Sequence, residues 1–203
     1  MRAAGRLPPG QAATLKFPVL HMGPVPNFDP ARWDFRVFGA VEHEVRWSWD
    51  EFNRLPRTRM TIDVHCVTRW SKFDTTWEGV SLRTLIDAGL IRPTVEAAYL
   101  LQHCECGFTA NLPLAVALQP NFLLATHFEG RPLEREHGYP LRGVVGVLPG
   151  SGLKTLYFWK GGKWLRGLEL LSGDRLGYWE RVGFHNAADV WKQQRWSRCK
   201  NVL

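Results

Sequence analysis

Short stretches of strand and helix pattern alternate along this chain, without a recurring strand–helix–strand unit. Alternating apolar residues predict strands over residues 34–41, 60–66, 98–103, 122–128 and 163–171. Ser48 with Glu51 three residues later matches a helix capping box, and this helix is expected to end near Pro56. Ser81 is expected to cap a second short helix that Gly89 terminates. Since a parallel sheet needs regular crossover helices, the pattern predicts an α+β fold with mixed β-sheets and short helices.

The beginning of the chain differs from the rest in being rich in proline and glycine and weakly periodic. We predict that residues 1–30 form an extended arm. Such an arm can reach into a site, because its backbone groups must find partners outside a helix or sheet. Residues 31–203 are enough for one sizeable domain, and no internal repeat or low-complexity segment divides them.

The charge of the chain is positive but diffuse. The net charge is +7, and its lysines and arginines form no block or stripe of the kind that binds nucleic acid. An anionic ligand or an acidic protein partner fits this pattern, whereas a nucleic acid partner is not expected. No apolar run of membrane-spanning length and no secretion leader is visible, so we expect a cytoplasmic protein with reduced thiols.

The ten tryptophans are an unusual number for this length. They either build an aromatic-rich core, which is the simpler interpretation, or partly line a deep pocket.

Cys66 stands at the end of a predicted strand and opens a segment that contains Thr68, Arg69 and Trp70. Strand ends that open into polar loops are common positions for functional residues. Arg69 and the neighbouring His65 are expected to favour the thiolate form of Cys66. The alternative is a small buried apolar residue, which describes most free cysteines. Spacing alone favours this alternative.

Two later segments carry groups that suit an anion. Residues 137–142 form a compact polar turn with a histidine and an arginine. Gly161 and Gly162 stand between Lys160 and Lys163, and paired glycines allow backbone N–H groups to approach a phosphate. The spacing matches neither a Walker loop nor a dinucleotide fingerprint. A flexible hairpin with solvated lysines is the competing interpretation, and it is favoured when the segment is taken alone.

Residues 103–106, His-Cys-Glu-Cys, concentrate four side chains that can bind a metal. The two cysteines are too close together for the usual zinc knuckle, and a fourth ligand would have to come from elsewhere. A packing role is therefore favoured for Cys104 and Cys106.

Several separated segments together resemble the sulfite oxidase-like molybdopterin oxidoreductases. The similarity is strongest to the small bacterial branch without a haem domain, which is related to the molybdenum-dependent protein methionine sulfoxide reductase catalytic subunit. It covers nearly the whole chain, and the segments that carry it are residues 17–26, 64–72, 111–114, 137–142, 157–164, 177–180 and 183–186.

The resemblance implies the sulfite oxidase fold, with one molybdopterin-binding domain over residues 31–203 and the arm reaching the cofactor site. It implies a molybdenum–molybdopterin cofactor, one per chain, whose metal is bonded by Cys66 as the catalytic ligand. A soft thiolate suits a metal that is held mainly by sulfur. By position, the resemblance implies cofactor contacts at His21, His103, His137, Arg142, Gly161, Gly162 and Lys163.

The chain departs from the sulfite oxidases where they hold the substrate oxyanion. Val19 and Leu20 stand where the family has an arginine in the arm, and Thr126 is assigned to the position of a tyrosine. Sulfite is a small dianion that needs fixed cationic or hydrogen-bonding partners. Two-electron oxygen-atom transfer by reduction of an S- or N-oxide, small or protein-bound, is therefore favoured over sulfite oxidation. The alternatives are a sulfite-oxidising enzyme with an altered pocket and a non-catalytic pterin-binding module.

Three further expectations follow from the resemblance. A separate electron-transfer protein is expected to supply electrons, and a monomer is expected because the dimerisation segment of larger sulfite oxidases is not seen. Residues 146–155 look like one extra short hairpin at the pocket entrance.

Overall fold

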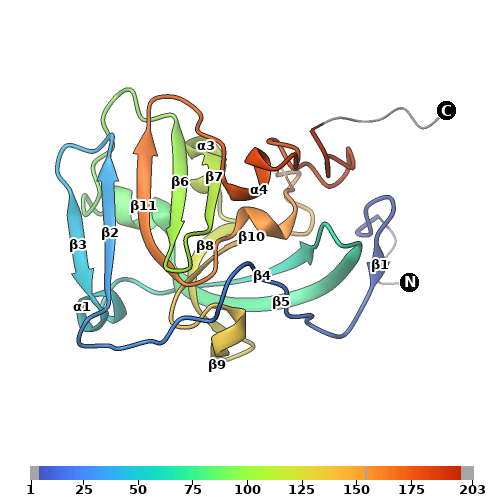
Figure 1. Ribbon diagram of the computed structural model, residues 1–203, viewed down its shortest axis with the longest axis horizontal. Helices are drawn as coiled ribbons and strands as arrows, with labels where there is room; N and C mark the ends of the chain where they lie inside the picture. Colours follow the sequence, from blue (N-terminus) through green and yellow to red (C-terminus); the bar gives the residue numbers. More distant parts are fainter. Residues whose placement is uncertain (1–4, 154, 198–203) are drawn as a thin grey trace.

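The computed structural model describes residues 5–153 and 155–197 as two mixed β-sheets with short helices between the strands. The first residues of the predicted arm and Cys199 lie outside this part. Figure 1 shows the five-stranded sheet standing beside the six-stranded sheet, whose long strands β4 and β5 run below it. This arrangement confirms the predicted α+β fold, since each sheet combines parallel and antiparallel pairs.

The six-stranded sheet has the order β1-β5-β8-β10, with β4 paired to β5 and β9 paired to β8. Its strands are β1 (Ala12–Ala13), β4 (Thr58–His65), β5 (Trp70–Val80), β8 (Phe122–Phe128), β9 (Arg131–Pro132) and β10 (Arg142–Val145). The five-stranded sheet has the order β3-β2-β11-β6-β7. Its strands are β2 (Asp34–Gly39), β3 (Val45–Ser48), β6 (Tyr99–Cys104), β7 (Thr109–Pro113) and β11 (Leu165–Leu171).

The helices are short, and two begin where the sequence predicted. They are α1 (Trp49–Asn53), α2 (Leu82–Asp87), α3 (Leu114–Ala117), α4 (Tyr178–Arg181) and the 3₁₀ turns η1 (Arg135–His137) and η2 (Phe158–Lys160). Both hydrogen bonds of the predicted capping box form at α1, between Ser48 and Glu51. Ser81 caps α2, and Gly89 follows its end with a left-handed backbone. Among the described residues, no helix is long and apolar enough to cross a membrane.

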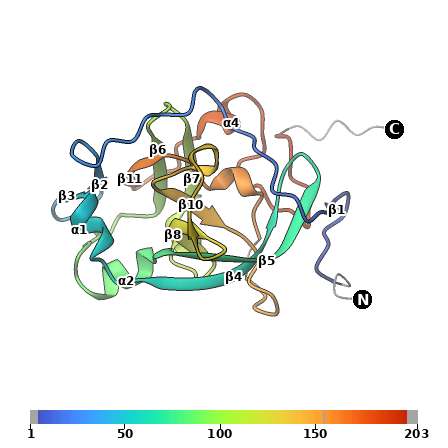
Figure 2. The same cartoon turned by 90° about the horizontal axis from the view of Figure 1, so that it is seen from below.

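The main core lies between the two sheets and contains side chains from both, such as Phe35 and Leu168 from one and Leu124 and Val145 from the other. A second cluster covers another part of the six-stranded sheet around Ile62 and Trp77. Seen from below in Figure 2, helices α1 and α2 lie at the end of the molecule away from β1.

Strand β5 is the largest element that sequence patterning missed. The segment after Cys66 was predicted to be a loop, but only a tight turn intervenes before eleven residues of strand begin at Trp70. The strand carries Lys72, Asp74 and Glu78 among its apolar residues, which weakens the alternating pattern. It pairs with β4 along nearly its whole length, so the charged residues are tolerated at partly exposed positions.

Candidate cofactor and active site

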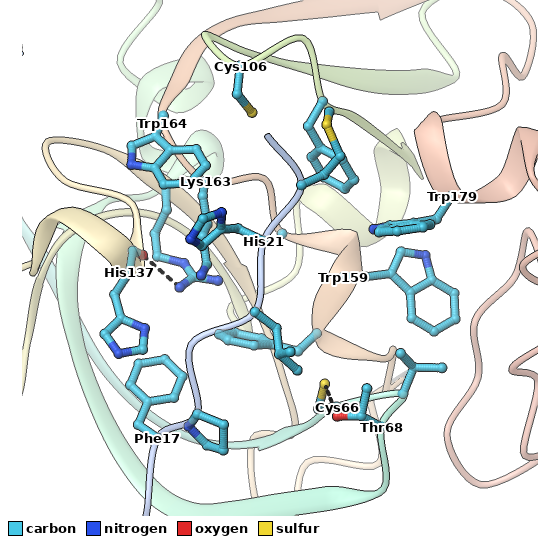
Figure 3. Close-up of a pocket in the computed structure, with 18 of the residues that line it drawn as sticks. Phe17, His21, Cys66, Thr68, Cys106, His137, Trp159, Lys163, Trp164 and Trp179 are labelled. Atoms are coloured by element: carbon cyan, nitrogen blue, oxygen red, sulfur yellow. Dashed lines mark hydrogen bonds between the residues drawn. The ribbon is translucent and has the colours of Figure 1, made fainter. Parts of the chain in front are cut away.

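A cavity of about 350 Å³ opens between the arm, the turn after β4, the β6–β7 hairpin, the 3₁₀ turns and the C-terminal segment. Figure 3 shows its side chains in two groups, with Cys66 at the lower wall between them. His137, Lys163 and Trp164 lie on one side, and Trp159 and Trp179 lie on the other. The cavity thus has a cationic half and an aromatic half that meet near one thiol.

Cys66 is presented by the tight turn that joins β4 to β5. Its N–H donates to Trp70 O at 2.9 Å, and the Arg69 N–H donates to Cys66 O at 3.0 Å. Arg69 closes the turn with a left-handed φ of 73°. The Thr68 hydroxyl donates to Cys66 Sγ at 3.1 Å. The sulfur is half-buried, lines the cavity and is held in a fixed position by these contacts.

Residues from both ends of the described chain hold this turn from outside. Gln11 Nε2 donates to Cys66 O at 3.0 Å, and the Ala12 N–H donates to Arg69 O at 2.9 Å. Arg195 Nε donates to Val67 O at 3.3 Å. These bonds join segments more than fifty residues apart, so sequence patterning had no means of finding them.

His65 does not play the role expected of it. Its ring is fully buried and its Nδ1 lies 2.7 Å from Ser71 Oγ. Burial lowers the pKa of His65 to about 4, so the ring is neutral near pH 7. The expectation that His65 contributes positive charge to the neighbouring thiol is therefore corrected.

Arg142 is a buried cation at the cavity wall, and no acidic side chain of the described residues pairs with it. Its side chain is 1% exposed, lines the cavity and donates from Nη1 to His137 O at 2.8 Å. The guanidinium lies over the Phe158 ring, 4.5 Å from its centroid. Among the described residues, Arg142 forms no ion pair with a carboxylate, and burial lowers its pKa to about 9. A buried charge of this kind is costly unless an anion accompanies it.

Lys163 and His137 flank Arg142 in the cationic half. Lys163 Nζ donates to the Glu136 carbonyl at 2.8 Å, and burial followed by repulsion from Arg142 lowers its pKa to about 7. Burial, followed by repulsion from Arg142 and from Lys163, lowers the pKa of His137 to about 4. The His137 ring stacks on Phe17 at 4.0 Å, and its buried Nδ1 has no hydrogen-bond partner among the residues that the structure describes. All three side chains line the cavity, and their contact with a cofactor stays a prediction.

The glycine pair serves packing. The Gly161 N–H donates to Phe158 O at 3.2 Å, and the Gly162 N–H donates to Gln102 Oε1 at 2.9 Å. Any side chain at Gly161 would overlap the backbone at Gly143, and one at Gly162 would overlap the Cys104 sulfur. Gly161 lines the cavity and Gly162 does not. The expectation that their N–H groups cradle a phosphate is corrected, because both amides already have partners inside the protein.

The arm crosses the cavity, as Figure 3 shows for the labelled Phe17 and His21. His21 lies edge-on to the Trp164 ring at 5.1 Å, and its Nδ1 is 3.0 Å from Gly23 O. Leu20 also lines the cavity, whereas Val19 does not. The His21 side chain thus lies at the cavity wall, and its contact with a cofactor stays a prediction.

Two other positions considered in the sequence lie elsewhere. His103 is outside the cavity lining, and its Nε2 pairs with Glu169 Oε2 at 2.8 Å, because β6 packs beside β11. Thr126 is buried on β8 and bonded to Arg57 and His127, so it is not a pocket position. Both assignments are corrected.

The two cysteines near His103 differ. Cys104 is buried in the core, and burial raises the pKa of its thiol. Cys106 lines the cavity opposite Cys66. Among the described residues, no group of three or more metal-binding side chains exists, so a zinc site at residues 103–106 receives no support.

The aromatic half of the cavity was not assigned from sequence. Trp159 donates from Nε1 to Glu180 Oε1 at 2.8 Å, which leaves its ring face toward the cavity. Phe184 packs edge-on to Trp159 at 5.2 Å and contacts Trp179 at 5.1 Å. The abundance of tryptophan was the available signal, and both of its interpretations hold: Trp77 belongs to the core and these rings line the pocket.

The donor set fits an anionic pterin cofactor. Arg142 and Lys163 form no ion pair with a carboxylate in the described part of the chain, which suits a phosphate group. Within the same part, the buried Nδ1 of His137 and Nε1 of Trp70 lack a hydrogen-bond partner. The flat rings of Trp164 and Phe17 can pack against a planar heterocycle. Cys66 supplies a soft ligand between these groups and the aromatic half.

Comparison with known proteins agrees with this interpretation. Residues 22–179 match the family model described as an oxidoreductase molybdopterin binding domain. The chain is 41% identical to the uncharacterized oxidoreductase YuiH of Bacillus subtilis, over 96% of this chain and 93% of that protein. It is 28% identical to the protein-methionine-sulfoxide reductase catalytic subunit MsrP of Gluconobacter oxydans and 27% identical to mitochondrial sulfite oxidase of Rattus norvegicus.

These last two similarities cover 85% and 82% of this chain, but only 60% and 34% of the relatives. Among solved structures, the sulfane dehydrogenase SoxCD of Paracoccus pantotrophus has a similar fold, with a TM-score of 0.63 at 18% identity over 78% of this chain and 42% of that one.

Proposed function

Because this chain belongs to the family of oxidoreductase molybdopterin-binding domains, we propose that Cys66 ligates molybdenum and that the enzyme reduces an S- or N-oxide. Membership confirms the resemblance predicted from sequence, and with it an oxidoreductase that binds molybdopterin with molybdenum. The bound cofactor supplies two-electron oxygen-atom transfer. The observation that carries the proposal is the position of Cys66, between a cationic half that suits the cofactor and an aromatic half that suits a neutral substrate.

The residues of the cationic half hold and orient the cofactor. Arg142 and Lys163 neutralise its phosphate, and binding restores the charged form of Lys163 because a nearby anion raises a lysine pKa. His137, neutral near pH 7, offers one ring N–H as donor and one ring nitrogen as acceptor to the pterin. The arm covers the cofactor through Phe17 and His21 and limits the access of water.

The aromatic half favours a neutral organic oxide over sulfite. The surface in this half is apolar and is formed by Val67, Trp159, Trp179 and Phe184. The indole N–H of Trp159 already donates a hydrogen bond to Glu180. A small dianion would need fixed cationic partners there, and the lining cations lie in the other half. Rings of this kind also make favourable contacts with sulfur. The relative named as a methionine sulfoxide reductase subunit supports a sulfoxide substrate.

A separate electron-transfer protein completes the proposed cycle. The diffuse positive charge would steer an acidic donor toward the enzyme. A cytoplasmic location and a monomeric state stay predictions.

Replacing Cys66 with serine tests the ligand role. We expect Cys66→Ser to lose at least a hundredfold in turnover, because a hydroxyl is a harder and poorer partner for this metal. Molybdenum and phosphorus contents would be measured together, with Cys106→Ser, which changes the other thiol at the cavity, as the matched control. Full activity in metal-loaded Cys66→Ser protein would contradict the ligand role.

The substrate class is tested with reduced wild-type enzyme and an artificial electron donor. We expect turnover of methyl aryl sulfoxides or aromatic N-oxides, and little oxidation of sulfite. Efficient sulfite oxidation would favour the altered sulfite oxidase. Stoichiometric molybdenum without redox cycling would favour the non-catalytic binding module.

A further inference from the structure

Thr68 makes a side-chain contact with the proposed metal ligand that the function above does not use. Its Oγ1 donates to Cys66 Sγ at 3.1 Å, as the dashed line in Figure 3 shows. Both residues line the cavity. Among the described residues, this is the hydrogen bond that the Cys66 sulfur receives.

The turn that carries Thr68 is held in place by hydrogen bonds from distant parts of the chain. Gln11 and Ala12 bind the carbonyls at its two ends, and Arg195 binds the carbonyl of Val67 between them. The backbone that carries Thr68 is therefore held independently of the Thr68 side chain. Thr68 itself is exposed toward the cavity, so its hydroxyl can change without opening a hole in the core.

We propose that Thr68 is a positioning residue that tunes the molybdenum centre through Cys66. A hydroxyl that donates to a thiolate withdraws electron density from the sulfur and weakens its donation to the metal. The reduced metal is then relatively favoured, since hydrogen bonds to ligand sulfurs are a recognised control of reduction potential. The inference rests on the proposed ligand role of Cys66, and it does not depend on which oxide is the substrate.

Two conservative variants separate the hydroxyl from the rest of the side chain. Thr68→Val keeps the shape and removes the donor, whereas Thr68→Ser keeps the donor and removes a methyl group. Thr61→Val, on the exposed face of β4 where Thr61 pairs with Thr76, is the matched control away from the site.

The measurement is a redox titration of the four molybdenum-loaded proteins, followed by the electron paramagnetic resonance spectrum of the one-electron-reduced metal. For Thr68→Val we expect the redox equilibrium to move about tenfold against the reduced form, a shift of about 30 mV to more negative potential for a two-electron couple. Its resonance parameters should change as well. Thr68→Ser and Thr61→Val should match the wild type.

Equal potentials and spectra in wild type and Thr68→Val would overturn the inference. So would equal shifts in Thr68→Val and Thr68→Ser, because packing rather than the hydroxyl would then be responsible. Cys66→Ser in the same titration separates this failure from that of the proposed function. A Cys66→Ser spectrum identical to the wild type would remove the ligand role and this inference with it, whereas a changed one without a Thr68→Val shift would remove this inference alone.

Discussion

At the scale of single residues, buried positive charge at the cavity lowers the stability of the protein when no cofactor is bound. Arg142 is fully buried and Lys163 lies beside it, and neither forms an ion pair with a carboxylate among the described residues. The His137 ring stacks on the Phe17 ring. It is neutral near pH 7, so it adds no further charge. The arrangement costs stability when the cavity holds no anion and contributes to affinity when it does, because the same desolvated charges then gain a partner.

The stability of cofactor-free protein should consequently depend on pH through Lys163. Its pKa falls from an ordinary value near 10.5 to about 7 on folding. Between these values the unfolded chain binds a proton that the folded chain does not, so the free energy of unfolding rises with pH above about 7. Below pH 7 the cost of burying the charged amine is fully present.

Urea denaturation at pH 6 to 9 measures this slope, which we expect to stay below about 1 kcal/mol per pH unit because Lys163 is only partly buried. Lys163→Met should reduce this slope of the free energy of unfolding against pH. Lys72→Met, on β5, should leave the slope unchanged. An unchanged slope in Lys163→Met would show that other groups cause it.

At the scale of elements, the β4–β5 hairpin joins the arm to the candidate site. Arg6 donates from Nε to Asp63 Oδ2 at 2.8 Å and also pairs with Asp74, so the beginning of the described chain is bonded to both strands. The Asp63 side chain is 1% exposed and additionally accepts from the Asp74 N–H at 2.9 Å. Farther along, β1 extends the sheet beside Trp70. The arm is therefore part of the sheet before it crosses the cavity.

Removing the arginine of this pair should destabilise the hairpin and the whole fold. For Arg6→Ala we expect a loss of about 1.5–3 kcal/mol in the free energy of unfolding, because the buried Asp63 carboxylate loses its charged donor. Arg83→Ala removes one partner of an exposed pair with Asp87 and should cost less than about 0.5 kcal/mol. Denaturant titration compares the two, and equal losses would show that the Arg6 contact is only a surface contact.

At the scale of the whole molecule, the C-terminal segment is tied to the rest by a buried polar network. Lys160 Nζ lies 2.7 Å from Glu180 Oε1, with side chains 2% and 1% exposed. Lys160 also donates to Asn111 Oδ1 at 2.8 Å, so η2, β7 and α4 meet at one point. Because Trp159 shares the Glu180 carboxylate, the same network orients a wall of the cavity.

Neutralising the carboxylate should loosen this junction. We expect Glu180→Gln to lower the free energy of unfolding by about 3–5 kcal/mol, because the buried Lys160 charge loses the Glu180 carboxylate. Glu42→Gln makes the same change in an exposed pair with Arg92 and should have an effect under about 1 kcal/mol. Calorimetry of both proteins measures the difference. Stability near the wild type in Glu180→Gln would mean that the charge of Glu180 does not stabilise this junction.

The sequence by itself determined the helix caps and several of the strands, and it singled out Cys66 for the candidate site. The capping box, the Ser81 cap and the alternating strands are local patterns, because neighbouring residues set helix ends and strand faces. The position of Cys66 at a strand end was also readable. Strand β5 was missed because its charged residues interrupt the alternation, although pairing with a long neighbour stabilises it.

Only the tertiary structure decided which remote residues share the cavity and which polar groups remain available. The side chain of Gln102, about sixty residues away in sequence, accepts the hydrogen bond of the Gly162 N–H. Glu169 binds His103 on the neighbouring strand, away from the cavity. The gathering of Trp159 and Trp179 opposite the cationic half depends on where the C-terminal segment packs. The physical reason is that hydrogen-bond partners and burial depend on contacts between distant segments, and residue type and spacing do not encode these contacts locally.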